Sequence, residues 1–323
     1  MNLFIVMTVL VLGFVGDCYG DDELLENHFY RHSCPAAEDL IQNLTCQFVA
    51  ANASLPAKFL RMHFHDCFVR GCEASILLDS TANNTAEKDA FPNLSLAGFD
   101  VIEAIKTEIE KICPGIVSCA DILSLVVRDA VSCQFDKPMW EVLTGRRDGV
   151  VSLASEALND LPSPFSNFAT LQQAFAGKNL SSEDLVVLSG AHTIGVANCQ
   201  FFSNRIYNFD GNGNPDPSLN ATYATFLRTQ CKGPSDTTTT VPMDGGSGLT
   251  FDNHYYTMLK ENEGLFQSDA AILTDHSARE YADKMTTNEV FFTKFANSVK
   301  RMAAIGVLTG SSGEIRKKCS AIN

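Results

Sequence analysis

The sequence has little positive charge. Its 323 residues include 24 Lys and Arg against 38 Asp and Glu, which gives a formal net charge of −14 at pH 7. A surface this acidic repels nucleic acids and anionic membranes, so we expect neither as a partner. The chain also lacks an internal repeat, and it has no linker long enough to force a division into independent domains.

Long apolar runs are also scarce, since one stands at the N-terminus and no second run reaches the roughly 20 residues that span a membrane. Residues 3–15 are apolar except for Thr8 and Gly13, and the small residues Gly16 and Gly20 follow. This pattern predicts a secretory signal peptide over residues 1–20 that is removed on export. The mature protein is expected to be soluble.

Cysteine, by contrast, is plentiful. The chain has 11 cysteines, one of which, Cys18, leaves with the signal peptide. An even number in an exported chain predicts disulfides, although sequence alone does not choose their pairing. Export also agrees with a set of candidate N-glycosylation sites, at Asn43, Asn52, Asn83, Asn179 and Asn220.

Helical periodicity dominates the rest of the chain. Apolar residues recur at helical spacing over 40–48, 102–112, 185–188 and 291–302. Residues 119–130 are almost continuously apolar and follow Ser118, a good N-cap, so we predict a buried helix there. Segments rich in Gly, Pro, Asn and Asp predict loops at 161–164, 208–220 and 237–248. We therefore expect a mainly α fold.

Residues 61–75 hold the most distinctive chemistry. Arg61 and His65 are four residues apart and share one face of a predicted helix. A fixed cation beside an imidazole that titrates near neutrality makes a candidate acid/base pair. Oxygen donors follow at nearly alternate positions, and calcium favours such a set, namely Asp66, the carbonyls of Val69 and Gly71, Glu73 and Ser75.

The same stretch allows a zinc alternative. His63, His65, Cys67 and Cys72 are all residue types that bind zinc. Their spacing matches no common zinc-finger pattern, and an exported chain tends to oxidise neighbouring thiols. We prefer the calcium interpretation and treat His63 as structural, because it points to a different helix face from His65.

Motifs along nearly the whole mature chain carry a resemblance to a known family. They lie at residues 29–35, 60–72 (LRMHFHDCFVRGC), 87–93, 118–121, 145–148, 184–193 (DLVVLSGAHT), 251–256 and 264–269. In these motifs and their order the chain resembles class III haem peroxidases, the secretory plant type. The resemblance implies an all-α haem peroxidase fold with minor short β segments. Two helical halves, roughly 21–165 (distal) and 166–310 (proximal), would sandwich one haem b.

The resemblance also implies a function. Such a protein is a donor:hydrogen-peroxide oxidoreductase, which reduces hydrogen peroxide and oxidises small phenolic donors in one-electron steps. His65 would accept a proton from peroxide, and Arg61 would stabilise the transition state. The other distal residues implied are Asn93, which would fix the tautomer of His65, Glu87 behind it, and Phe64.

On the proximal side, the resemblance makes His192 the axial ligand of the haem iron, supported by Asp269. Phenolic donors would bind at an exposed haem edge near Pro162, Ser163 and Phe91. The main rival is a non-catalytic haem or calcium protein of the cell wall that kept the fold. We expect a monomer in the extracellular space of the plant cell wall rather than in the vacuole.

Two calcium ions are implied as well. The first would use the oxygen-rich loop already described, and the second would use Thr193, Asp244, Ser247, Asp252 and the carbonyl of Thr250. Glu73 departs from the family, which usually has Asp there. Residues 244–248 (DGGSG) depart too, since the family usually has Asp-x-x-Thr-Pro. Because Gly is more flexible than Pro, we expect weaker calcium binding at the second site.

The resemblance finally pairs eight cysteines, as Cys34–Cys113, Cys67–Cys72, Cys119–Cys319 and Cys199–Cys231, the third of which would tie back the C-terminal segment. Cys46 and Cys133 are left over. Each falls on an apolar helical stretch, so we expect buried free thiols, with a fifth disulfide between them as the alternative. Asn93 also begins an acceptor sequence for glycosylation, and we expect it to be unmodified because its role requires burial.

Overall fold

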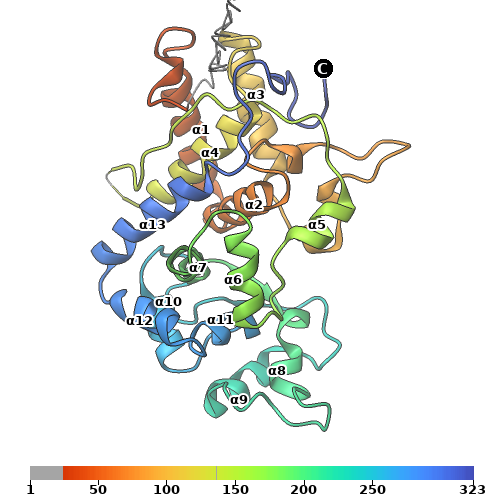
Figure 1. Ribbon diagram of the computed structural model, residues 1–323, viewed down its shortest axis with the longest axis vertical. Coiled ribbons are helices and arrows are strands. Elements are labelled where there is room, and N and C mark those ends of the chain that lie inside the picture. Colours follow the sequence, from red (N-terminus) through yellow and green to blue (C-terminus); the bar gives the residue numbers. More distant parts are fainter. Residues whose placement is uncertain (1–24, 136) are drawn as a thin grey trace, which may run out of the picture.

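The computed structural model describes residues 25–135 and 137–323, so the predicted signal peptide lies outside the described residues. Within them the chain is mainly helical, as the sequence predicts (Figure 1). The α-helices are α1 (Ala37–Ala51), α2 (Leu55–Val69), α3 (Phe99–Ile112), α4 (Cys119–Ser132), α5 (Ala154–Asp160), α6 (Phe168–Ala176), α7 (Ser182–Ser189), α8 (Ser203–Tyr207), α9 (Ala221–Gln230), α10 (His254–Lys260), α11 (Gln267–Ile272), α12 (His276–Lys284) and α13 (Asn288–Met302).

Short elements complete the fold. The 3-10 helices are Phe29–Arg31, Ser75–Leu77, Glu87–Asp89, Phe91–Asn93, Gly190–Thr193 and Cys199–Phe201. Strands β1 (Val196–Asn198) and β2 (Thr240–Pro242) form a small antiparallel sheet in which Ala197 pairs with Val241. None of the helices in the described residues is long and apolar enough to cross a membrane.

Two helices are the centres of the packing. Helix α4 packs against α1, α2 and α3, whereas α7 packs against α6, α12 and α13. Figure 1 shows α13 running from beside α4 toward α12, so it links the two groups. One large apolar core includes side chains of both groups, among them Ile122 and Phe295, and a smaller core lies around α8, α9 and the strands.

Helix α4 is buried along its whole length. The Ser118 hydroxyl caps its N-terminus by accepting a hydrogen bond from the Asp121 backbone N–H, at 3.0 Å. The Asp121 carboxylate is buried but well paired, since it accepts hydrogen bonds from Tyr30 Oη (2.7 Å) and Arg146 Nη1 (2.9 Å). The motifs at 118–121 and 145–148 therefore fix the helix that supports α2.

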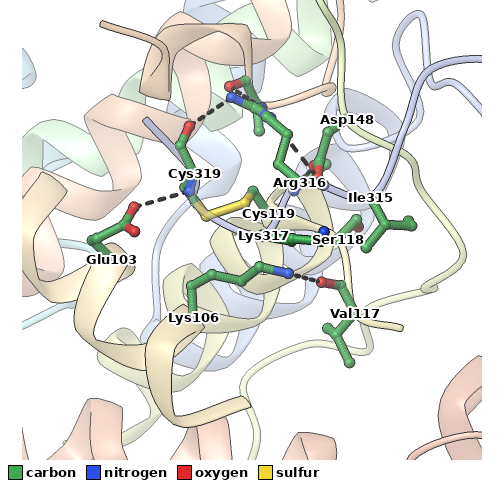
Figure 2. Close-up of a disulfide and its surroundings, with 12 residues drawn as sticks. Glu103, Lys106, Val117, Ser118, Cys119, Asp148, Ile315, Arg316, Lys317 and Cys319 are labelled. Carbon is green, nitrogen blue, oxygen red and sulfur yellow. Dashed lines mark hydrogen bonds and ion pairs between the residues drawn. A yellow bond between two sulfur atoms is a disulfide. The ribbon is translucent and has the colours of Figure 1, made fainter. Parts of the chain in front are cut away.

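The C-terminal segment returns to the α3–α4 group (Figure 2). Cys319 is bonded to Cys119 at the start of α4, and its N–H donates to the Glu103 carboxylate of α3 at 2.9 Å. Arg316 is fully buried and donates to the carbonyls of Ala74 and Cys319, each at 2.6 Å. The segment thus also holds the loop that follows α2.

Five disulfides join the described residues, and the four pairings implied by the resemblance are all present. The expectation of free thiols at Cys46 and Cys133 is wrong, because these residues form the fifth disulfide, with their Cα atoms 5.7 Å apart. Cys46 lies on α1 and Cys133 follows α4, and these helices pack side by side. Both residues are half-buried rather than buried.

Candidate active site

Helix α2 carries both residues of the candidate acid/base pair. His65 is buried, and its Nδ1 is hydrogen-bonded to Asn93 Oδ1. Asn93 Nδ2 in turn donates to the backbone carbonyl of Glu87, at 2.7 Å. Because the amide nitrogen is engaged in this way, the amide oxygen faces His65 and the imidazole proton sits on Nδ1. The Nε2 atom of His65 is left as the acceptor.

The electrostatic surroundings keep His65 neutral. Burial and the nearby Arg61 guanidinium lower the pKa of His65 to about 3, and the hydrogen bond with Asn93 opposes this only in part. Burial also lowers the pKa of Arg61 to about 10, so the guanidinium stays charged near neutrality. Arg61 is held in place by the segment that contains Asn93, since it donates to Ser95 Oγ (2.9 Å) and to the Pro92 carbonyl (2.6 Å).

Phe64 lies next to this pair. Its ring centroid is 5.7 Å from that of His65 and 4.3 Å from that of Phe68. Phe175 of α6 packs against Phe68 at 4.9 Å, so aromatic contacts extend from α2 to the helix before α7. These contacts restrict the position of α2, the helix that carries Arg61 and His65.

His192 follows α7 in the 3-10 helix Gly190–Thr193. A capping box of Ser181 and Asp184 fixes the start of α7. His192 Nδ1 lies 2.8 Å from Oδ1 of Asp269, a residue of α11 that is 1 % exposed. The imidazole therefore has a fixed orientation.

The Asp269 carboxylate has several hydrogen-bond partners. It accepts hydrogen bonds from Tyr255 Oη (3.0 Å) and from the Phe266 backbone N–H (2.7 Å), in addition to the contact with His192. Burial opposes the charge of Asp269, but His192 and these hydrogen bonds hold its pKa below the usual value. An ionised carboxylate on Nδ1 makes the other ring nitrogen a better electron donor.

The residues present fit a haem iron. The His192 side chain is 36 % exposed although one of its nitrogens is anchored to a buried carboxylate. Its Nε2 forms no hydrogen bond within residues 25–135 and 137–323, which is the condition an axial ligand must meet. A histidine that binds a metal typically has one ring nitrogen hydrogen-bonded to a carboxylate and the other nitrogen available, and His192 has this arrangement.

The expected donor residues lie at the surface. Phe91 is 59 % exposed, and its ring centroid lies 6.2 Å from that of Phe201, a residue that the sequence analysis did not single out. Ser163 is exposed and Pro162 half-buried in the loop before α6. The same loop touches the proximal side, because Ser268 N–H of α11 donates to the Pro164 carbonyl at 3.0 Å.

The distal calcium loop contains buried oxygens without protein partners. Asp66, Glu73 and Ser75 are all buried, and neither Glu73 Oε1 nor Ser75 Oγ has a hydrogen-bond partner among the described residues. Nearby Glu87 is also buried, and within the part of the chain that the structure describes its carboxylate forms no well-aligned hydrogen bond, although the Ser75 and Ser152 hydroxyls lie near enough to act on its pKa. Burial, together with the neighbouring carboxylates, raises the pKa of Asp66 to about 7 and that of Glu87 to about 8. The buried oxygens of Glu73 and Ser75 are of the kind that a hard cation binds. The other expected ligands have protein partners, since the Val69 carbonyl accepts from Lys178 Nζ at 3.1 Å and the Gly71 carbonyl from the Glu73 N–H at 2.8 Å.

The loop of the expected proximal calcium site is held by several hydrogen bonds. Thr193 Oγ1 donates to Asp252 Oδ1 at 2.8 Å, and Asp244 accepts from the backbone N–H groups of Gly246 (2.7 Å) and Ser247 (3.1 Å). His254 Nδ1 also lies 2.8 Å from both carboxylate oxygens of Asp244. The Asp244 carboxylate thus has hydrogen-bond partners, as does Asp66 of the distal loop, which accepts from the backbone N–H groups of Ala74 (3.0 Å) and Ile76 (3.4 Å).

The zinc alternative does not fit. Cys67 and Cys72 are joined by an S–S bond, so neither offers the thiolate that zinc requires. His63 lies near this disulfide, with Nδ1 3.7 Å from the sulfur of Cys67, whereas His65 is engaged with Asn93. Burial, followed by the charge of Arg146, lowers the pKa of His63 to about 3.

The predicted glycosylation sites differ in exposure. Asn43, Asn52, Asn83 and Asn179 are exposed. Asn220 is half-buried and caps α9, because its Oδ1 accepts hydrogen bonds from two backbone N–H groups at the start of that helix. Asn93 is 1 % exposed, which leaves no room for a sugar.

The site thus holds one imidazole anchored to a carboxylate, His192, and one neutral imidazole in the field of a guanidinium, His65. The sequence model of the family described as "Peroxidase" matches residues 41–288. Among similar proteins, Peroxidase 24 of Arabidopsis thaliana is 52 % identical over 305 residues, which cover 93 % of this chain and 87 % of the relative. Peroxidase 3 of Arabidopsis thaliana is 47 % identical over 327 residues, covering all of both chains.

Peroxidase 1 of Oryza sativa subsp. japonica is 48 % identical over 305 residues and covers 93 % of each chain. The chain belongs to the class III haem peroxidases of plants. It is therefore an enzyme that reduces hydrogen peroxide with electrons taken from a donor. The family match also implies haem as the cofactor.

Proposed function

We propose that His65 and Arg61 carry out the proton chemistry of hydrogen peroxide reduction, and that phenols are the electron donors. The observation that carries this proposal is the state of His65, which is neutral, has its proton fixed on Nδ1 by Asn93 and lies in the field of Arg61. A base in that state can accept a proton across the whole neutral pH range.

His65 Nε2 would accept a proton from one oxygen of hydrogen peroxide and give it to the other oxygen, which would leave as water. Arg61 stabilises the negative charge that develops on the departing oxygen as the O–O bond breaks. When bound, one haem b per chain supplies the redox chemistry, taking two oxidising equivalents from peroxide and passing them to two donor molecules one electron at a time. The balance is one peroxide and two donors giving two waters and two donor radicals.

His192 would hold the iron through Nε2, while Asp269 accepts the N–H of Nδ1. This contact increases the electron density that His192 donates, and it favours the oxidised states of the iron. In this proposal the cofactor lies between a distal half built around α4 and a proximal half built around α7.

Phenolic donors are supported by the exposed aromatic surface. Phe91 projects into solvent beside Phe201, and an aromatic donor can stack on such rings, with Pro162 and Ser163 as further contacts. Ten cysteines in five disulfides support an oxidising compartment, and we infer secretion to the plant cell wall, with sugars on the exposed acceptor sites.

We also propose two calcium ions. The unpartnered oxygens of Glu73 and Ser75 support the distal site, in which Asp66 and the carbonyls of Val69 and Gly71 complete the ligand set. The proximal site, with Thr193, Asp244, Ser247 and Asp252, is expected to bind more weakly because its loop is rich in glycine and costs more entropy to order.

The test is a haem absorption band together with peroxide-dependent oxidation of guaiacol by the calcium-loaded protein. His65→Leu should keep the haem band and lose most of the oxidation, whereas His276→Leu, at a side chain that is 88 % exposed, should change neither. A haem band without oxidation in the unaltered protein would favour the rival, a non-catalytic haem protein.

A further inference from the structure

Gly149 lies directly against the carboxylate of Glu73. A Cβ atom placed on Gly149 would lie 2.4 Å from the carboxyl carbon of Glu73 and 2.5 and 2.6 Å from its two oxygens. Real Cβ atoms do not approach other atoms so closely, because repulsion rises steeply below van der Waals contact. The Glu73 carboxylate therefore occupies the space that a side chain at position 149 would need.

Backbone conformation gives no reason for this glycine. Gly149 is not among the residues with a positive φ, so an alanine could adopt the same backbone without strain. The three atoms nearest to the added Cβ all belong to the Glu73 carboxylate, so a side chain at position 149 would force the end of the Glu73 side chain to move.

The backbone around Gly149 is held firmly. The Gly149 N–H donates to the Glu73 carbonyl at 2.8 Å, which fixes the two residues relative to each other. The preceding Asp148 carboxylate accepts from the backbone N–H groups of Ala120 and Arg316, each at 2.9 Å. A methyl group on residue 149 would therefore displace the end of the Glu73 side chain rather than the backbone.

We propose that Gly149 is a positioning residue for the distal calcium site, and that it makes room for the carboxylate of Glu73. This inference rests on the proposed calcium function of that site. Because Asp is one methylene shorter than Glu, we expect an aspartate at position 73 to end before it reaches Gly149. A glutamate at position 73 thus depends on glycine at position 149, whereas an aspartate at position 73 does not.

A double-mutant cycle tests the pairing on the haem-loaded protein. The variants are Gly149→Ala, Glu73→Asp and the double variant, and the measurements are bound calcium after gel filtration and calorimetric titration of the calcium-depleted protein. Gly149→Ala should weaken distal calcium binding about tenfold or more in the Glu73 background. With Asp at position 73, the same change should weaken it by less than about threefold, because residues that no longer touch are not coupled.

Two controls separate the possible failures. Asp66→Ala shows which of the calcium-binding steps in the titration belongs to the distal site, since it removes another proposed ligand of that site. Gly177→Ala, where an added Cβ makes only ordinary contacts at 3.5 Å, should leave calcium binding unchanged. If Gly149→Ala changes calcium affinity equally with Glu or Asp at position 73, or changes it in neither case, the proposed dependence of Glu73 on Gly149 is overturned. If Asp66→Ala binds as much calcium as the unaltered protein, the distal calcium site itself is overturned, and the proposal with it.

Discussion

His65 and His192 are the same side chain in opposite electrostatic surroundings. His65 has a neutral amide on Nδ1 and a guanidinium nearby, and both its burial and that cation disfavour protonation. His192 has the same atom against an ionised, buried carboxylate. The difference indicates that the partner of Nδ1 determines the role of each histidine. An amide leaves the imidazole neutral and able to accept a proton, whereas a carboxylate makes it an electron-rich ligand.

Removing the distal imidazole should have the largest effect. We expect His65→Leu to slow the reaction with hydrogen peroxide by about 100- to 10,000-fold, the usual range for loss of general acid/base catalysis. The haem absorption band should persist, because the proposed iron ligand is His192. Stopped-flow mixing with peroxide measures the rate, and a loss below about tenfold would mean that another group takes the proton.

Removing the charge on the proximal side should have the next largest effect. Asp269→Asn keeps the shape of the side chain but removes the carboxylate from Nδ1 of His192. Changes to such supporting groups typically reduce activity or metal affinity by about 10- to 100-fold. Turnover and the reduction potential of the iron, which should rise, are the measurements. The matched control is Asp283→Asn, at a side chain that is 56 % exposed, and it should change neither.

Making the distal side resemble the proximal side should have a smaller effect at neutral pH. In Asn93→Asp a carboxylate replaces the amide on Nδ1 and stabilises the imidazolium, which should raise the pKa of His65 by about one to three units. The unaltered protein, with this pKa at about 3, should react with peroxide at a constant rate from neutral pH downward and slow only as the pH approaches 3.

In the variant the loss on acidification should begin at a higher pH, because His65 accepts a proton only above its own pKa. The pH profile of the peroxide reaction is the measurement. Identical profiles for the two proteins would show that the partner of Nδ1 does not set the protonation of His65.

Each side also carries a disulfide whose removal should affect stability rather than activity. Cys46–Cys133 closes a sequence separation of 87 residues in the distal part, whereas Cys199–Cys231 closes 32 in the proximal part. Replacing both Cys46 and Cys133 by Ala should lower the free energy of unfolding by about 2 to 4 kcal/mol with the peroxide rate unchanged. Replacing Cys199 and Cys231 provides the comparison. The chain-entropy account predicts a similar loss there, because the Cys34–Cys113 disulfide already shortens the loop that Cys46–Cys133 closes to about 32 residues, (46 − 34) + (133 − 113). Thermal and denaturant unfolding measure both.

The sequence by itself determined the local features. Periodic apolar residues and the cap at Ser118 predicted α4, because helical hydrogen bonds and capping contacts join residues only a few positions apart. The spacing of Arg61 and His65 gave the acid/base pair for the same reason. The roles of Asn93, His192 and Asp269, however, came from the resemblance to a family and not from any local rule.

Only the tertiary structure decided the pairings between distant segments. Cys46 and Cys133 looked like buried thiols because an apolar helical position predicts burial, and only the packing of α1 on α4 brings the two sulfurs together. The contact between His254 and Asp244 and the space that Gly149 leaves for Glu73 were likewise invisible, since each depends on where two loops meet. Sequence periodicity carries information about faces of helices, whereas contacts across the chain follow from how those faces pack.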